Sequence, residues 1–189
     1  MFKKQNKYTN RLQTHYEAHF KTKGTRKKWN VDPNNKLRKE FHVLEISPNK
    51  VHNMWAYCTL GMSLDREDNN LIEAVIYSPR EDEALVELLS LVSSFHNNSA
   101  ALNLHHTFEI GHSWLDDSLC NYGFVSLPYL DGEGLEIFKF EDKVFHCYWI
   151  IPITKSEREL KIKHGCEALE NLFEEKGINY VNPNRLSLV

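Results

Sequence analysis

The residues best suited to chemistry gather in one short stretch, LNLHHTFEIGHSWLDDS, which runs from Leu102 to Ser118. It contains three histidines, one tryptophan and two adjacent aspartates. Zinc accepts three imidazoles and leaves a fourth position open for water, and Asp116 or Asp117 would then act as the base. The stretch is therefore either a metal site or part of the scaffold.

The spacing of the histidines argues against a metal site. His105 and His106 are sequence neighbours, and on a strand they point to opposite faces of the sheet. Only one of them could therefore join His112 without a sharp bulge. This stretch also has no His-x-x-x-His or His-Glu-x-x-His pair to anchor a metal. We predict no metal and no cofactor, and a metal-dependent hydrolase using His106, His112 and Asp116 stays as an alternative.

Patterns of nucleophilic catalysis are incomplete. The sequence Gly111-His112-Ser113-Trp114 lacks the second glycine of the G-x-S-x-G turn that exposes a nucleophilic serine. On a helix, the side chains of His164 and Cys166 would diverge by about 200°. The chain has no G-x-G-x-x-G or Walker A sequence. We predict no catalytic residue and a protein that is not an enzyme.

The elements that must hold this stretch alternate between strands and helices. Short β-type runs are expected at 41–47, 54–61 and 71–78. A helix is expected to open at Ser78-Pro79-Arg80-Glu81, with a serine cap and a proline at its first position, and to end near Ser99. One face of this helix carries a predicted buried stripe of Leu85, Leu88, Leu89, Val92 and Phe95.

The second half of the chain predicts a meander followed by another helix. Strands are expected at 104–110, 124–130, 135–141 and 144–151, with a hairpin at Asp131-Gly132-Glu133-Gly134. A capping box at Ser156-Glu157-Arg158-Glu159 opens the second helix, which runs towards Gly177, and Gly165 weakens or breaks it. Its predicted inward stripe is Ile162, Cys166, Leu169 and Phe173. The fold class is α+β, with a mixed, largely antiparallel sheet packed with two main helices.

Charge divides the chain at about residue 40. Residues 1–40 contain 12 lysines and arginines against 3 acids, whereas 41–189 contain 11 against 23. We interpret residues 1–40 as a basic N-terminal arm with a short helix at Leu12–Phe20, and 41–189 as the main domain. A regulator that grips nucleic acid through this arm is an alternative, although we expect no nucleic-acid partner. With no secretory h-region, no membrane-spanning run and four scattered cysteines, we expect a cytoplasmic protein without a membrane partner.

Several motifs, taken in order, resemble the suppressor-of-fused (SUFU) domain family in its bacterial single-domain form. They include Thr59-Leu60-Gly61-Met62-Ser63, IEAVIYSP at 72–79, HTFEIGHSW at 106–114, the block from 150 to 175, and NPNRLS at 182–187. The likeness runs from about Phe41 to Val189. One departure is Leu44, where the family often has an acidic residue two positions after the histidine that corresponds to His42.

The resemblance implies a domain that binds protein and carries out no reaction. Bacterial members of the family are similar to immunity proteins that neutralise a cognate toxin. The acidic balance of 41–189 suits a basic toxin domain, because complementary charge speeds association. The expected partner-binding residues are His112, Trp114, Asp116, Asp117, Asp131 and Glu133. On this interpretation, the histidine stretch is a scaffold strand and the loop after it.

Overall fold

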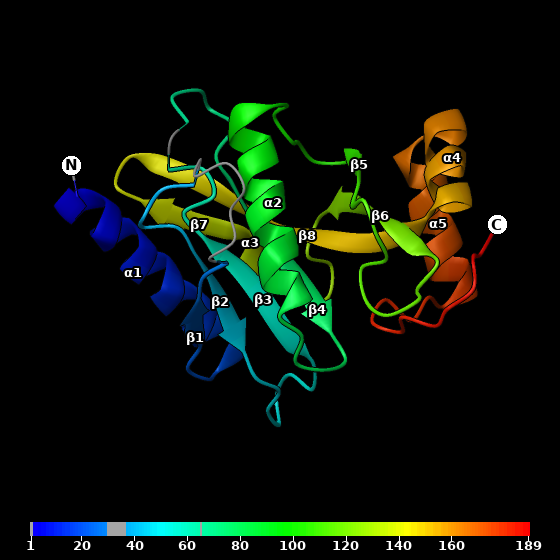
Figure 1. The fold of residues 1–189 in the computed structure, drawn as a ribbon, viewed down its shortest axis with the longest axis horizontal. Helices are drawn as coiled ribbons and strands as arrows, with labels where there is room; N and C mark the ends of the chain where they lie inside the picture. Colours follow the sequence, from blue (N-terminus) through cyan, green and yellow to red (C-terminus); the bar gives the residue numbers. More distant parts are fainter. Residues whose placement is uncertain (1, 30–36, 65) are drawn as a thin grey trace.

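The computed structural model describes residues 2–29, 37–64 and 66–189 (Figure 1). The helices are α1 (Phe2–Phe20), α2 (Ala84–Asn98), α3 (Glu133–Glu136), α4 (Lys155–His164) and α5 (Cys166–Lys176). The strands are β1 (Thr25–Lys27), β2 (His42–Ile46), β3 (Trp55–Leu60), β4 (Ile72–Ser78), β5 (Thr107–Glu109), β6 (Cys120–Ser126), β7 (Ile137–Phe140) and β8 (Lys143–Thr154). None of the helices in these ranges is long and apolar enough to cross a membrane.

All the strands belong to one sheet in the order β1-β2-β3-β4-β8-β6-β5, and β7 pairs with β8 beside this path. Every pairing is antiparallel except that of β4 with β8. The 12-residue β8 holds the sheet together, because β7 pairs with its first part, β6 with its last part and β4 with its middle. The predicted mixed, largely antiparallel sheet is confirmed.

Helices cover both faces of this sheet (Figure 1). Helix α1 packs on one face through Leu12, Tyr16 and Phe20, and α5 adds Phe173 to the same apolar cluster. Helix α2 packs on the other face, where its buried leucines meet alternate residues of β2, β3 and β4. All seven residues of β4 are buried, as expected of a strand covered on both faces.

The N-terminal segment packs on this sheet. The predicted helix at Leu12–Phe20 is confirmed, but it begins at Phe2 and has 19 residues, so the prediction of two main helices is incomplete. Strand β1 then pairs with β2. The charge count of residues 1–40 did not indicate this packing, because the buried residues Tyr8, Leu12, Tyr16 and Phe20 recur every four positions among mostly polar ones. A domain division at residue 40 stays a prediction.

The start of α2 differs from the prediction. Ser78 does not cap the helix, because it ends β4, where it pairs with Trp55. Its hydroxyl forms a local turn with the backbone of Arg80, and the helix begins at Ala84 without a side-chain cap. Four of the five predicted stripe residues are buried, but Phe95 is 40% exposed.

The hairpin predicted at Asp131–Gly134 is wrong. Strands β6 and β7 do not pair with each other; both pair with β8. The segment between them forms α3, so the chain passes from one part of β8 to another. The observed hairpin joins β7 to β8 through Glu141 and Asp142, where Glu141 has a φ of 55°.

The second helix is divided as the sequence suggested. Gly165 separates α4 from α5 with a φ of 92°, which confirms the predicted break. Thr154, and not Ser156, forms the capping box with Glu157, because β8 continues to Thr154 and leads directly into the helix. Ile162 is 61% exposed, so its predicted place in the inward stripe is wrong, whereas Leu169 and Phe173 are buried.

A buried carboxylate explains the Thr59–Ser63 motif. Glu73 on β4 is fully buried and accepts hydrogen bonds from the Thr59 hydroxyl (2.5 Å) and from the backbone N–H groups of Gly61 and Met62. Gly61 has a φ of 103°, which favours glycine and turns both N–H groups towards the carboxylate. The Tyr8 hydroxyl of α1 donates the remaining bond, at 2.7 Å.

A second buried carboxylate connects two further motifs, the block from 150 to 175 and NPNRLS at 182–187. Glu157 of α4 is fully buried and lies 2.6 Å and 2.7 Å from the two terminal nitrogens of Arg185 in the C-terminal tail. Its oxygens also accept from the backbone N–H groups of Thr154 and Leu188. The tail is thereby held against the end of β8 and the start of α4.

Candidate protein-binding groove at the sheet edge

Strand β5 is an edge of the sheet and leaves half of its backbone groups unpaired with β6. Its neighbour on one side is β6, and no further strand follows among the residues the structure describes. The Ile110 N–H donates to Asn121 O, and the Val125 N–H donates to His106 O. Since backbone groups along a strand point alternately to either side, those of Thr107 and Glu109 face away from β6. They are free to pair with another strand.

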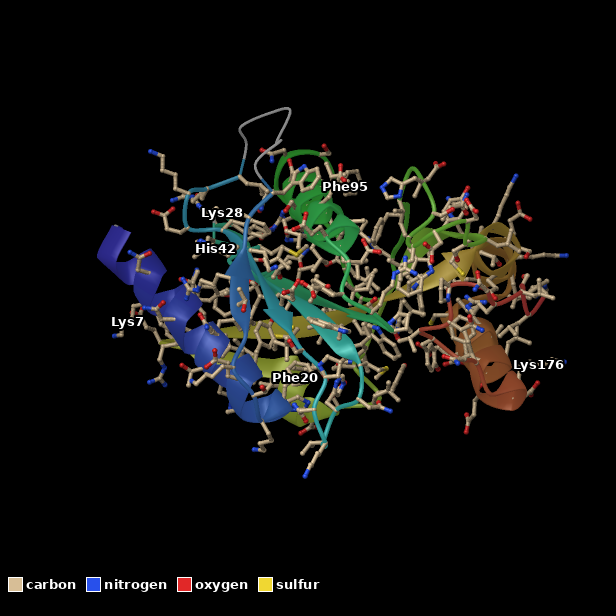
Figure 2. The ribbon with its side chains drawn as sticks, turned by 60° about the horizontal axis from the view of Figure 1, so that its bottom comes forward. Lys7, Phe20, Lys28, His42, Phe95 and Lys176 are labelled. Carbon is tan, nitrogen blue, oxygen red and sulfur yellow. The ribbon has the colours of Figure 1, made fainter. Side chains whose placement is uncertain are left out.

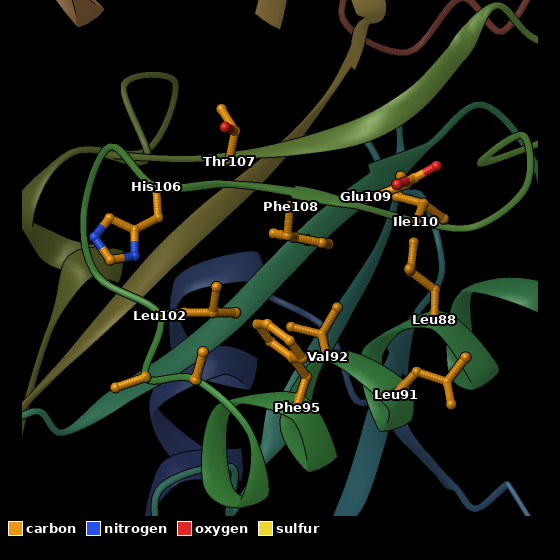
Figure 3. Close-up of a pocket in the computed structure, with 12 residues that line it drawn as sticks. Leu88, Leu91, Val92, Phe95, Leu102, His106, Thr107, Phe108, Glu109 and Ile110 are labelled. Carbon is orange, nitrogen blue, oxygen red and sulfur yellow. The ribbon is translucent and has the colours of Figure 1, made fainter. Parts of the chain in front are cut away.

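An apolar groove of about 520 Å³ runs between this edge strand and the outer flank of α2. The helix contributes Leu88, Leu91, Val92 and Phe95, which are spaced three or four positions apart. Figure 3 shows Phe108 of β5 pointing towards Val92 and Phe95, while Thr107 points the other way. Leu91 and Phe95 are each 40% exposed, so the outer flank of α2 presents apolar surface to this groove.

A glycine on β6 seats the groove's central ring. Phe108 pairs with Gly123 across the strands. A Cβ atom added at Gly123 would lie 2.4 Å from the Phe108 ring, so the ring lies directly against the glycine backbone. Aromatic rings that cover a glycine in this way help to fix strand register. Phe108 is thereby held as a preformed wall of the groove.

This geometry suits an extended peptide. A strand added to a sheet edge gains affinity from backbone hydrogen bonds and specificity from pockets that take alternate side chains. Here the backbone groups of Thr107 and Glu109 can form the hydrogen bonds, and the apolar groove beside Phe108 can take the side chains. The polar lining groups, His106 and Glu109, stand at the rim.

The predicted site residues of the loop after β5 have different environments. His112 and Asp117 are exposed. Trp114 is only 1% exposed and its indole N–H donates to the Ser118 hydroxyl, so it holds the loop from inside and offers no contact surface. Asp116 receives two hydrogen bonds from the Arg80 guanidinium, which lowers the pKa of the carboxyl.

Asp131 and Glu133 lie elsewhere, at the start of α3. The Asp131 carboxylate accepts from the Tyr77 hydroxyl and lies 2.8 Å from His19 Nε2, and its side chain is almost fully buried. It therefore ties α1 to the end of β4, and its predicted role as a contact residue is not supported by its position. Glu133 is exposed. The six predicted residues do not form a single site.

The described residues contain no group of three or more His, Cys, Asp or Glu side chains arranged to hold a metal ion. His105 and His106 lie in a turn before β5, and His105 has a φ of 66°, so the expected strand begins later than predicted. His106 lines the groove, while His112 Nδ1 lies 2.6 Å from the carbonyl oxygen of Ser113. The structure does not bring His106, His112 and Asp116 together.

The nucleic-acid alternative rests on basic residues at the end of the molecule opposite α5. Figure 2 shows Lys7 and Lys28 at this end and Lys176 at the other. Arg26 is bound to Gln13 and Asn10 of α1. Trp29, which follows β1, packs against the apolar cluster on the α2 side. This alternative stays a prediction.

Sequence reasoning missed the groove itself. Most of its lining residues are ordinary apolar ones, whereas the predicted site residues are a histidine, a tryptophan and four acids. One signal was available, since Leu91 and Phe95 extend the apolar face of α2 beyond the width that one sheet can cover. The position of β5 at an edge depends on the order of the strands in the sheet, and this order cannot be predicted from local sequence patterns.

Comparisons with known proteins agree with this architecture. A SUFU homologue from Neisseria gonorrhoeae, solved by crystallography, superposes with a TM-score of 0.84 at 28% identity, with 97% of each chain covered. A chain of the Sufu–Fu complex gives 0.72 at 11% identity, covering 96% of this chain and 92% of that one. Drosophila Suppressor of Fused gives 0.57 at 12% identity, and this chain spans 42% of its length.

Among curated sequences, the Immunity protein YqcF of Bacillus subtilis (strain 168) is 25% identical over 176 residues, which cover 86% of this chain and 87% of YqcF. The family model for Suppressor of fused protein (SUFU) matches residues 38–186. That match spans most of the chain and contains both the edge strand and α2. The chain belongs to the Suppressor of fused (SUFU) protein family.

Proposed function

We propose that this protein is an immunity protein that binds a cognate bacterial toxin and blocks it by occlusion, with an extended segment of the toxin added to β5. The observation that carries the proposal is the open edge of β5 beside the apolar groove. Support for a protein partner comes from the Sufu–Fu complex, and support for a toxin from the likeness to YqcF.

The negative charge of residues 41–189 supports a toxin with a basic surface, but ion pairs within the molecule neutralise some of the acids. Arg80 is shared by Asp82 and Asp116, and Asp68 pairs with Arg66. These acids are largely neutralised within the molecule. The remaining exposed acids, such as Glu83 and Asp117, carry the excess negative charge of residues 41–189. We expect this charge to raise the association rate at low salt more than it raises affinity.

The test begins with capture of the partner from the source cells by the tagged protein, followed by co-expression of the captured protein with and without this chain. We expect one stoichiometric partner that arrests growth alone and is neutralised by the wild-type chain. The variant Thr107→Pro removes an outward N–H from the edge strand and should abolish neutralisation. Leu91→Ser, in the groove, should weaken it.

The matched control for Leu91→Ser is Ile162→Ser, which changes another exposed apolar helix residue outside the groove. It should neutralise as well as the wild type. If Thr107→Pro and Leu91→Ser are folded and protect cells fully, the toxin does not bind at this edge. If the captured partner has no effect on growth, the immunity role is wrong even where binding at β5 is retained.

A further inference from the structure

A second groove, of about 440 Å³, lies on the opposite face of the sheet. It is lined by Tyr129, Ile151, Glu170, Asn171, Phe173, Glu174 and Tyr180. Ile151, Phe173 and Tyr180 belong to the apolar cluster shared with α1, whereas the residues of the first groove belong to the cluster of α2. We call this second site the acidic–aromatic groove.

Two carboxylates of α5 face this groove from successive turns of the helix. Glu170 Oε1 accepts a hydrogen bond of 2.8 Å from the Tyr129 hydroxyl and lies 3.9 Å from His105 Nε2. Glu174, four residues later, is exposed. No lysine or arginine within the described part of the chain pairs with either carboxylate. The negative charge of the groove is therefore not offset by a lysine or arginine of the described residues, and His105 is the basic side chain near Glu170.

Aromatic rings and an apolar floor accompany this charge. Tyr129 is 54% exposed and stands at the rim. Tyr180 is partly buried, packs edge-on against Phe173 and lies 4.7 Å from the Trp149 ring. Ile151 and Phe173 are buried beneath. Burial, together with the charges of Glu170 and Glu174, raises the pKa of Tyr180.

An arginine side chain matches these features. Its methylene stem can lie along the apolar floor, while its planar guanidinium stacks on a tyrosine ring and donates to a carboxylate. Helix α1 and strand β1 lie at the other end of the molecule from α5 (Figure 1). A cation supplied by another molecule would match the charge and the rings of this lining.

We propose that the acidic–aromatic groove binds an arginine side chain of the protein partner. The proposal rests on the proposed function for the existence of that partner, but the groove is separate from β5. His105 and His106 are adjacent in the turn before β5, one near Glu170 and the other lining the first groove. A partner lying along β5 could thus reach both faces of the sheet around this turn.

The probe for the test is the peptide acetyl-Gly-Arg-Gly-amide, compared with peptides that carry lysine or glutamine in place of arginine. Binding is followed by amide chemical shifts of the full-length ¹⁵N-labelled protein. We expect saturable millimolar shifts at 170–174 and at Tyr180 with the arginine peptide, weaker shifts with lysine, and none with glutamine. Thr107→Pro should leave these shifts unchanged, which separates this test from that of the edge strand.

The deciding variant is Glu170→Gln/Glu174→Gln, which removes both charges with little change in shape. Its affinity for the arginine peptide should fall at least roughly tenfold. The matched control, Glu167→Gln/Glu175→Gln, removes two exposed acids of α5 that do not line the groove and should bind as the wild type does. Equal binding by both double variants would overturn the proposal.

Other occupants give different outcomes in the same experiment. A free polyamine would be indicated if spermidine produced the same shifts at lower concentration than the arginine peptide. A second copy of the chain would be indicated if the shifts at 170–174 appeared on raising the protein concentration alone. Either result would overturn the assignment to an arginine side chain of a partner.

Discussion

The two fully buried carboxylates, Glu73 and Glu157, have similar burial and different chemistry. Glu157 faces the Arg185 guanidinium, whereas Glu73 receives hydrogen bonds only from hydroxyl and backbone N–H groups. Burial raises the pKa of both. At Glu73 the four donors compensate only partly for burial, so the pKa rises to about 7. At Glu157 the bonds and charge of Arg185 outweigh burial, and the pKa falls below its usual range.

This difference shows which contact between elements depends on an ion pair and which does not. Glu73 joins α1 to the sheet through Tyr8, and Glu157 joins the C-terminal tail to α4 through Arg185. The folded state binds the Glu73 proton more tightly than the unfolded chain does, so this group makes folding less favourable as the pH rises from about 4.5 to 7. Glu157 acts in the opposite sense, since its stabilisation is present above its unfolded pKa and is lost as the pH falls through the lower folded value.

The largest effect is expected from Arg185→Met. It leaves the Glu157 carboxylate buried without a cation, which typically costs about 3–5 kcal/mol. Urea unfolding at pH 7 measures the change in the free energy of unfolding. The double variant Glu157→Gln/Arg185→Met serves as the control and should recover much of the loss, because no buried charge remains. If Arg185→Met alone is as stable as the wild type, the ion pair does not hold the tail.

A smaller effect, visible as a pH slope, is expected from Glu73→Gln. The wild type should lose on the order of 2–3 kcal/mol relative to this variant between pH 4.5 and 7, because only the wild type must ionise a buried group. The measurement is the free energy of unfolding of both proteins across this range. Since other titrating groups are common to both, their difference isolates Glu73. Parallel curves would show that Glu73 does not titrate in this window.

Tyr8→Phe should cost about 1 kcal/mol by removing one donor from Glu73. The loss should be greater at pH 8 than at pH 5, because the ionised carboxylate depends more on its donors. Thermal unfolding and amide exchange along α1 measure it. Tyr16→Phe is the matched control on the same helix, since its hydroxyl bonds only to Cys147 Sγ at 3.4 Å. Equal effects of both changes at both pH values would contradict a stabilising role for the hydrogen bond between Tyr8 and Glu73.

The smallest effect is expected from Ser187→Ala. Its hydroxyl lies 2.6 Å from the Ser156 hydroxyl and 3.0 Å from that of Thr154, and these neutral bonds together contribute roughly 0.5–1 kcal/mol. Chemical unfolding at pH 5 and pH 8 should give the same small loss at both. A loss as large as that of Arg185→Met would show that hydroxyls, and not the buried ion pair, hold the C-terminal tail.

Local patterns in the sequence predicted much of this framework. Four-residue spacing located Leu12, Tyr16 and Phe20 of α1, and Gly165 marked the break between α4 and α5. The cap at Ser156 was misplaced because β8 runs to Thr154, beyond the strand expected at 144–151. The cap at Ser78 was misplaced because α2 begins only at Ala84, although β4 ends at Ser78 as expected. The pairing of β6 and β7 with the same strand was not predictable from spacing, since adjacent β-type runs favour a hairpin.

The site was less accessible from the sequence than the fold. The predicted site residues include Trp114 and Asp131, whose side chains are almost fully buried, and omit Phe95 and Phe108, which line the groove. The contact of Glu73 with Tyr8 joins residues far apart in the chain, and neither has a local pattern that names the other. An open edge and two grooves on opposite faces are properties of the assembled sheet.

The position of β8 sets the order in which the protein can be made. A ribosome releases α1, β4 and α2 long before Lys143–Thr154, yet β4, β6 and β7 all need that strand as a neighbour. Until β8 emerges, the fully buried strand β4 lacks one of its two flanking strands. The nascent chain must therefore pass most of its synthesis with an incomplete sheet, a stage at which chaperones protect exposed strands. The sheet that carries the edge strand β5 is complete only after that stage ends.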